Sequence, residues 1–210
     1  MLEIVGSLPV EFYLTGGTAL SRAYLHHRHS DDLDFFLNRA QDFKQQVNEV
    51  TRAFSSSSQQ FEVANTDENY ARIFITGPDC TLKLDFVNDV AFRRGLPVKT
   101  SIFIRTDTIL NILSNKLSAL SRYATKDLVD IVFISENTPF TWEEIFDDAS
   151  QKDLWVNPVN IAEILEKFPV QKLQEIAWAG QIPSDEWFMS RVNRIIPDIL
   201  DGGSNSLFKA

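Results

Sequence analysis

The spacing of apolar residues changes near residue 105, and this change restricts the possible fold more than any other feature of the sequence. Before that point, short β-branched and aromatic runs are separated by turn residues, which is typical of strands. Beyond it, apolar residues recur every three or four positions, which is typical of amphipathic helices. The sequence therefore predicts an α+β protein, in which a mixed β-sheet with flanking helices (residues 1–105) precedes a helical C-terminal domain (residues 106–210).

The same patterns place the individual elements. The first part is expected to contain five strands, at residues 10–14, 33–37, 61–64, 70–76 and 81–87, and two helices, at residues 19–26 and 42–54. Gly77, Pro78 and Asp79 predict that the last two strands form a hairpin. The second part is expected to contain five helices, at residues 107–120, 125–134, 141–149, 159–168 and 185–200.

Composition narrows the class of protein. Hydrophobic residues make up 44% of the 210 residues, which is ordinary for a globular chain and argues against global disorder. No apolar run approaches the ~18–20 residues that a membrane helix needs. A single cysteine, Cys80, excludes an internal disulfide and a multi-cysteine zinc site. We expect a protein of the reducing cytoplasm with no membrane partner.

Charge is distributed unevenly along the chain, whose net charge is −9. Residues 93–126 contain seven basic side chains and a single acidic one, Asp107. A locally positive segment in an acidic chain can bind a compact anion such as a nucleotide phosphate. A protein that binds a long duplex is usually basic over the whole domain, so the charge favours a nucleotide as ligand.

Asp32 and Asp34 are the strongest candidates for a chemical role. Residues two apart in a strand point to the same side, so both carboxylates face one point while Leu33 faces the core. Two carboxylates this close repel each other unless a cation lies between them, and Mg²⁺ held by one or two carboxylates and substrate phosphates is the natural cation. The alternative is an exposed strand edge with solvated acids, and Asp-x-Asp alone does not decide between them.

Two further motifs favour the metal site. On the strand at residues 81–87, Asp85 alternates with apolar residues and could join Asp32 and Asp34 as a third ligand or as a general base. Gly16, Gly17 and Thr18 form a glycine turn before a helix, where unpaired backbone N–H groups favour phosphate. Together these motifs predict a site for metal-assisted phosphoryl or nucleotidyl transfer.

Three blocks of sequence resemble a known family. Residues 14–20 (LTGGTAL) and 28–36 (RHSDDLDFF) are similar to the AbiE-type (AbiEii-like) nucleotidyltransferase toxins of abortive-infection systems, within the DNA polymerase β-like nucleotidyltransferase superfamily. Residues 116–120 (KLSAL) and 126–130 (KDLVD) resemble the later motifs of that family. The resemblance covers residues 12–134.

The resemblance implies a role for each matching residue. Gly16, Gly17 and Thr18 would hold the triphosphate, with Arg28 and Ser30 beside them as nucleotide-binding residues. The metal, Mg²⁺ or Mn²⁺, would be bound by Asp32, Asp34 and Asp85. Lys116 would contact the nucleotide phosphates or stabilise pyrophosphate as it leaves. Asp127 matches the late acidic motif, with Asp130 as the alternative, and the additional acid Asp31 allows a different pairing of metal ligands.

The resemblance also implies what the protein acts on. The reaction would move a nucleoside monophosphate from an NTP to an acceptor hydroxyl and release pyrophosphate. The chain would be a toxin with a separate antitoxin protein, and tRNA or another RNA end would be the acceptor. Two alternatives stay open: a nucleotidyltransferase that modifies a small molecule, and a nucleotide- or partner-binding module without turnover.

All three histidines lie within four residues, at His26, His27 and His29. Neighbouring positions at a helix end do not converge on one ion and no cysteine supports them, so solvent exposure or contact with an anion is favoured over a metal site.

Overall fold

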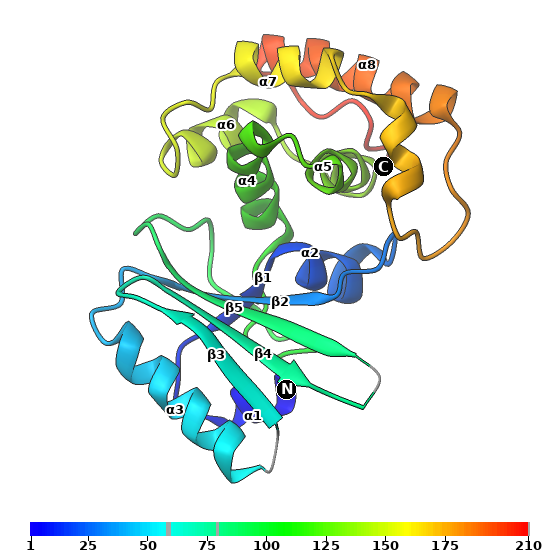
Figure 1. Ribbon diagram of the computed structural model, residues 1–210. Helices are drawn as coiled ribbons and strands as arrows, with labels where there is room; N and C mark the ends of the chain where they lie inside the picture. Colours follow the sequence, from blue (N-terminus) through cyan, green and yellow to red (C-terminus); the bar gives the residue numbers. More distant parts are fainter. Residues whose placement is uncertain (58–59, 79, 210) are drawn as a thin grey trace. The chain divides into compact units, whose positions relative to one another are not determined.

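The structure is a computed structural model, and it describes residues 1–57, 60–78 and 80–209. Contacts within the chain divide it into two compact units (Figure 1). The first consists of Met1–Tyr24 and Ser30–Thr108, and the second of Leu25–His29 and Ile109–Ala210. The short segment of residues 25–29 is therefore an excursion of the N-terminal part of the chain into the second unit.

The first unit is built on one five-stranded sheet with the order β1-β2-β5-β4-β3. Its strands are β1 (Tyr13–Thr15), β2 (Asp32–Asn38), β3 (Gln60–Thr66), β4 (Tyr70–Thr76) and β5 (Thr81–Asp89). The central pair β2 and β5 is parallel, whereas the other neighbours are antiparallel. The predicted α+β fold with a mixed sheet is confirmed.

Strict alternation along β2 determines which face of the sheet is buried. Leu33, Phe35 and Leu37 are buried, while the residues between them are half-buried. The Phe35 ring stacks on Phe86 of β5 at a centroid distance of 5.2 Å. This aromatic layer is the core of the first unit, and it fixes the register of the two parallel strands.

The helices α1 (Leu2–Ser7) and α3 (Phe43–Ser56) lie beside the sheet. α3 buries Phe43, Val47, Val50 and Phe54, which recur at helical spacing. α1 packs against α3, and both are seen together at one side of the sheet in Figure 1. α1 is not predicted by the sequence, because six residues with one buried side chain, Val5, carry too short a pattern.

The turn region after β1 differs from its prediction. The expected helix at residues 19–26 is a short α-helix, α2 (Gly16–Ala19), that continues as a π-helical segment (Leu20–Leu25). β1 is shorter than expected, because it pairs with β2 only at Tyr13, Leu14 and Thr15. β4 and β5 pair antiparallel as predicted, with Asp79 of the connecting turn outside the described residues.

The second unit is helical. Its α-helices are α4 (Ile109–Ala119), α5 (Thr125–Asn137), α6 (Trp142–Ser150), α7 (Pro158–Glu166) and α8 (Asp185–Asp201), with 3-10 segments at Leu120–Arg122 and Val170–Glu175. Side chains of Thr141, Asn157 and Ser184 accept hydrogen bonds at the first turns of α6, α7 and α8. Across the residues that the structure describes, no helix is both long and apolar enough to span a bilayer.

Candidate active site

The glycine turn after β1 is adapted to the acidic strand beside it. Gly16 has a φ of +69°, and a Cβ built there would collide with the carboxylate oxygen of Asp34. A side chain at this position is therefore excluded both by the backbone conformation and by the nearby carboxylate. Thr18 is fully buried, and its hydroxyl donates to the carbonyl oxygens of Asp32 and Ser30. These contacts tie the start of the helix to the start of β2.

Asp32 and Asp34 lie on the half-exposed face of β2, as the alternation predicts. The additional acid Asp31 precedes the strand and is exposed. Both strand carboxylates are thus accessible to a ligand, whereas the intervening Leu33 is buried.

β5 brings a third carboxylate to the same face. It runs parallel to β2, and Asp85 is the register partner of Asp34. The side chain of Asp85 is 11% exposed, compared with 33% for Asp32. Asp32, Asp34 and Asp85 therefore belong to two neighbouring strands at the level of the glycine turn.

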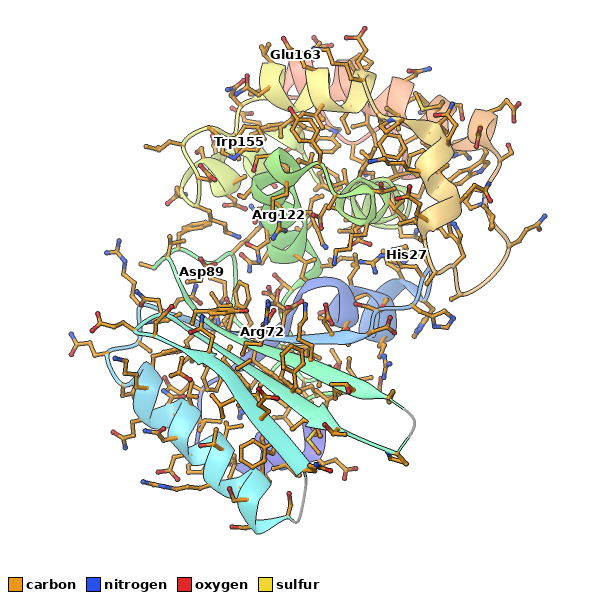
Figure 2. The ribbon with its side chains drawn as sticks, viewed as in Figure 1. His27, Arg72, Asp89, Arg122, Trp155 and Glu163 are labelled. Atoms are coloured by element: carbon orange, nitrogen blue, oxygen red, sulfur yellow. The ribbon has the colours of Figure 1, made fainter. Side chains whose placement is uncertain are left out.

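Asp85 is held by two side chains of β4. Arg72 donates to both carboxylate oxygens, through Nε at 2.7 Å and Nη2 at 2.9 Å, and the Tyr70 hydroxyl donates to Oδ1 at 2.8 Å (Figure 2). Burial on its own would raise the pKa of Asp85, but the hydrogen bonds from Arg72 and Tyr70 outweigh it and lower the pKa. Burial and the bond to Asp85 raise the pKa of Tyr70 to about 12, so Tyr70 remains a neutral donor.

Lys83 lies between two of the acids. Its Nζ is 2.7 Å from Oδ2 of Asp32 and 3.7 Å from Oδ2 of Asp85. Burial lowers the pKa of Lys83, but the hydrogen bond with Asp32 and the charges of both acids more than compensate, and the pKa is raised. Lys83 is therefore a fixed cation of this site.

Sequence reasoning did not identify Tyr70, Arg72 and Lys83 as members of the site. Lys83 stands two residues before Asp85 on the same face of β5, a signal visible in the sequence. Arg72 could be identified only through the register, because it is the antiparallel partner of Asp85 across β4 and β5.

The oxygen-only donor set of Asp32 and Asp34 fits a hard divalent cation. Within the described residues, no three His, Cys, Asp or Glu side chains are grouped as a metal site. Arg72 and Lys83 already form ion pairs with Asp85 and Asp32.

In the second unit, Lys116 of α4 joins two acids of α5. Its Nζ is 2.7 Å from Oδ1 of Asp127 and 2.7 Å from Oδ2 of Asp130. All three side chains are buried. Burial lowers the pKa of Lys116, but the charges of Asp130 and Asp127 reverse the shift and raise it. Arg122, on the exposed surface, approaches Asp127 at 3.4 Å.

Asp130 also binds the excursion of residues 25–29. Arg28 donates to its two oxygens through Nε and Nη2, each at 2.7 Å, and Nε2 of His27 lies 2.9 Å from Oδ1. Burial would raise the pKa of Asp130, yet the charge of Lys116 and the bonds from His27 and Arg28 hold it well below its ordinary value. Arg28 is thus engaged inside the second unit rather than extended into solvent.

The histidines separate into two kinds. His27 is buried against Asp130 and the ring of Phe133, whereas His26 and His29 are exposed (Figure 2). The sequence favours solvent exposure or contact with an anion for these histidines. His26 and His29 are exposed, and His27 contacts the carboxylate of Asp130 in the same unit.

Comparison with known proteins relates this arrangement to nucleotidyltransferases. Two crystal structures from Helicobacter pylori are similar: JHP933, with 20% identity, a TM-score of 0.58 and coverage of 95% of this chain and 89% of that one, and a candidate nucleotidyltransferase, with the same identity and TM-score and coverage of 95% and 92%. At this identity, the likeness shows the fold. None of the curated proteins compared with the chain matches it.

The sequence itself provides the assignment. Residues 5–188, which include the glycine turn, all three strand acids and the Lys116 and Asp130 motifs, match the family described as nucleotidyl transferase AbiEii toxin of type IV toxin–antitoxin systems. The match extends well past residue 134, where the resemblance of individual motifs ends. The chain therefore belongs to the AbiEii family of nucleotidyltransferase toxins.

Proposed function

We propose that this protein is a metal-dependent nucleotidyltransferase that transfers a nucleoside monophosphate from an NTP to an acceptor hydroxyl and releases pyrophosphate. The observation that carries the proposal is the register of β2 and β5, with Asp34 opposite Asp85 and Asp32 on the same face. In this proposal the nucleotidyltransferase core corresponds to residues 1–105, and residues 106–210 are the helical domain.

Asp32 and Asp34 would hold the metal, Mg²⁺ or Mn²⁺, with Asp85 as the third acid. When bound, the ion neutralises charge that develops on the transferred phosphoryl group. Asp85 is better suited to a fixed negative charge than to a general base, because Arg72 and Tyr70 lower its pKa and so weaken it as a proton acceptor. Its bidentate partner Arg72 keeps the carboxylate in one orientation.

Nucleotide binding would use residues of both sequence blocks. We assign Gly16, Gly17 and Thr18 to the triphosphate, with Ser30 and Arg28 as the adjacent nucleotide-binding residues. Because the Arg28 guanidinium is bound to Asp130 inside the second unit, it would have to leave that carboxylate to contact a nucleotide. Lys116 would stabilise the leaving pyrophosphate and Asp127 would orient the lysine, although Lys116 is buried between Asp127 and Asp130 and would have to give up one of these ion pairs to do so. In the reaction, the acceptor oxygen forms a bond to the α-phosphorus while the bond between that phosphorus and the β-phosphate oxygen breaks.

The biological role follows from the family. We propose that the protein is a toxin neutralised by a separate antitoxin protein, with an RNA end, such as that of tRNA, as the acceptor. The acidic charge of the chain argues against a long duplex as substrate.

A binding module without turnover is the second candidate. The observation that favours it is the neutralisation of Asp32 by Lys83 and of Asp85 by Arg72, because a site whose acids already have cationic partners has less need of a metal. A small molecule as acceptor remains the third possibility.

A labelling experiment separates these candidates. The purified protein and its Asp32→Ala/Asp34→Ala variant are incubated with each α-³²P NTP, Mg²⁺ and total RNA. Label in RNA with the wild type alone is the expected result. Label on the protein, or only on an added small molecule, would show that this molecule and not RNA is the acceptor. Binding of NTP with no labelled product would favour the binding module.

A further inference from the structure

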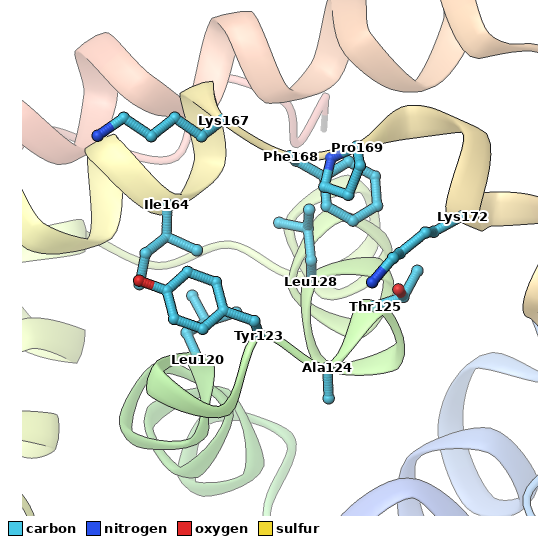
Figure 3. Close-up of a pocket in the computed structure, with 10 residues that line it drawn as sticks. All are labelled: Leu120, Tyr123, Ala124, Thr125, Leu128, Ile164, Lys167, Phe168, Pro169 and Lys172. Atoms are coloured by element: carbon cyan, nitrogen blue, oxygen red, sulfur yellow. The ribbon is translucent and has the colours of Figure 1, made fainter.

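A cavity of about 180 Å³ lies within the second unit, between the start of α5 and the segment that connects α7 to the 3-10 segment Val170–Glu175 (Figure 3). Its volume is slightly larger than the ~150 Å³ of an apolar cavity that admits benzene. The cavity can thus accept one flat ring system of the size of a nucleobase. The cavity is lined by residues that include Tyr123, Thr125, Leu128, Lys167, Phe168 and Lys172.

The walls of the cavity are apolar and aromatic. Leu128, which is 2% exposed, contributes an aliphatic side chain, and Phe168 contributes an aromatic ring. At the mouth stands Tyr123, which is 72% exposed and directly follows the 3-10 segment Leu120–Arg122. A flat ligand would therefore meet rings and an aliphatic side chain, as bases do in sites for single-stranded nucleic acids.

Tyr123 occupies an unusual backbone conformation for so large a residue. Its φ of 53° and ψ of 31° are left-handed, a conformation in which glycine is favoured at the end of a helix. A non-glycine residue there is strained, because its Cβ comes too close to a backbone carbonyl oxygen. Because the Tyr123 ring is mostly exposed, its burial does not offset this strain, which indicates that the ring has a role other than packing.

Charge at the rim is positive. Figure 3 shows the Lys172 side chain directed towards the hydroxyl of Thr125, and no described acidic side chain forms an ion pair with Lys172. Lys167 forms an ion pair with the exposed Glu163, at 3.5 Å. Lys126 and Arg122, both exposed, flank the Tyr123–Thr125 segment. In a chain with a net charge of −9, this local excess of cations fits an anion beside the apolar cavity.

We propose that the cavity binds one unpaired nucleotide of a single-stranded RNA, with the base in the cavity beside Tyr123 and its phosphate at Lys172. RNA is favoured over a free nucleotide because Lys126, Lys167 and Arg122 offer cations for further phosphates along a strand. The inference rests on the proposed function, to which it adds a subsite for the acceptor. An apolar side chain of a protein partner would fill the cavity but would leave these cations without a role.

The test measures RNA binding by the full chain in the absence of NTP and metal. The probe is a short fluorescein-labelled single-stranded oligoadenylate, whose anisotropy gives Kd over a range of salt concentrations. We expect Tyr123→Gly, which relieves the left-handed strain, to weaken binding about tenfold, because base–aromatic stacking contributes about 1–3 kcal/mol. We expect Lys172→Gln to lower the slope of log Kd against log salt by about 0.7, the loss of one phosphate contact on a single strand.

Matched controls separate these effects from general ones. Tyr123→Phe retains the ring and is expected to bind as the wild type does. Lys209→Gln removes an exposed charge elsewhere in the same unit and is expected to leave both Kd and the salt slope unchanged. AMP should bind much more weakly than the oligoadenylate, and a duplex of the same length should not depend on Tyr123.

The proposal is overturned if the wild type does not bind the probe, or if Tyr123→Gly and Lys172→Gln bind it with the wild-type Kd and slope. Loss of antitoxin binding by Tyr123→Gly, with unchanged RNA binding, would make the cavity a protein-docking site instead. The Asp32→Ala/Asp34→Ala variant should bind the probe normally. Probe binding that depends on Tyr123, without transfer of label from NTP, would therefore refute the proposed function and leave the RNA site intact.

Discussion

At the scale of single residues, Asp130 illustrates how a buried charge can be stabilised. Its carboxylate is fully buried and is bonded by Arg28, His27 and Lys116. Removing the charge would leave the cations Arg28 and Lys116 without their shared partner in the interior. We expect Asp130→Asn to lower the free energy of unfolding by about 3–5 kcal/mol, the usual effect of breaking a buried ion pair. Urea denaturation followed by circular dichroism measures it.

The same residue predicts a pH dependence. The folded pKa of Asp130 lies below the ordinary value of 3.8, so its carboxylate stabilises the fold above that pH, and the contribution is lost as the pH falls towards the folded pKa. The difference in stability between the wild type and Asp130→Asn should therefore be constant near neutrality and shrink below about pH 4. Glu166→Gln, at an exposed position, is the control. A difference that is unchanged by acid would contradict this account.

Lys83 offers a separate prediction about the acidic strands. Its ammonium lies 2.7 Å from Asp32 and competes with any cation for that carboxylate. We expect Lys83→Met to raise the affinity for Mn²⁺ roughly tenfold, which corresponds to about 1.4 kcal/mol of repulsion removed. Titration followed by the electron paramagnetic resonance of free Mn²⁺ measures it.

Lys44→Met is the matched control, because Lys44 is an exposed lysine of the same unit that pairs with the exposed Glu68, at 3.8 Å. An unchanged or lower affinity for Mn²⁺ in Lys83→Met would show that Lys83 does not compete with the metal.

Membership of the site could be predicted from the sequence where the pattern lies within one strand. It could not be predicted where the register between two strands decides which residues meet. Asp32 and Asp34 are recognisable because the spacing of two places them on one face. Arg72 and Tyr70 are not recognisable in this way, because their relation to Asp85 depends on the antiparallel register of β4 and β5. The contacts of His27 and Arg28 with Asp130, about a hundred residues away in sequence, are equally invisible to local patterns.

At the scale of elements, the turn between β1 and α2 is the most constrained connection of the site. Gly16→Ala would impose a left-handed conformation on alanine and place its Cβ against the carboxylate of Asp34. We expect a loss of about 1–2 kcal/mol from the backbone alone. The rate of nucleotidyl transfer should fall by more than the loss of folding stability explains, because the Asp34 side chain must move away from the added methyl group.

Gly180→Ala is the control, since a Cβ there meets open space and the φ is ordinary. Thermal unfolding and label transfer are compared for both variants and the wild type. Wild-type transfer by Gly16→Ala would contradict a role for the turn in positioning Asp34.

Elements with strong periodicity match their predictions, whereas short ones do not. α3, β4 and α8 begin within a residue of their expected starts, because the spacing of their apolar residues indicates them. The π-helical continuation of α2 has no sequence signature that distinguishes it from an ordinary helix turn. α1 has a single buried residue and therefore lacks a periodic pattern.

At the scale of the whole molecule, the chain combines a sheet unit that carries the three acids with a helical unit that holds the Lys116 cluster. The change in apolar spacing near residue 105 predicts from the sequence that a part with a β-sheet precedes a helical part. It does not predict that residues 25–29 belong to the helical unit, because that placement depends on contacts far apart in the sequence. These are the side-chain contacts with Asp130 and two backbone hydrogen bonds, from His29 N–H to the Ala177 carbonyl and from Ala179 N–H to the His27 carbonyl.

We propose that the protein transfers a nucleoside monophosphate and does not hydrolyse NTP. Pyrophosphate release and monophosphate incorporation into RNA are therefore measured in the same reaction, for the wild type and for Asp34→Asn. We expect equal amounts of the two products with the wild type and neither product above background with Asp34→Asn. Release of inorganic phosphate, or of pyrophosphate without incorporation, would contradict it, as would undiminished transfer by Asp34→Asn.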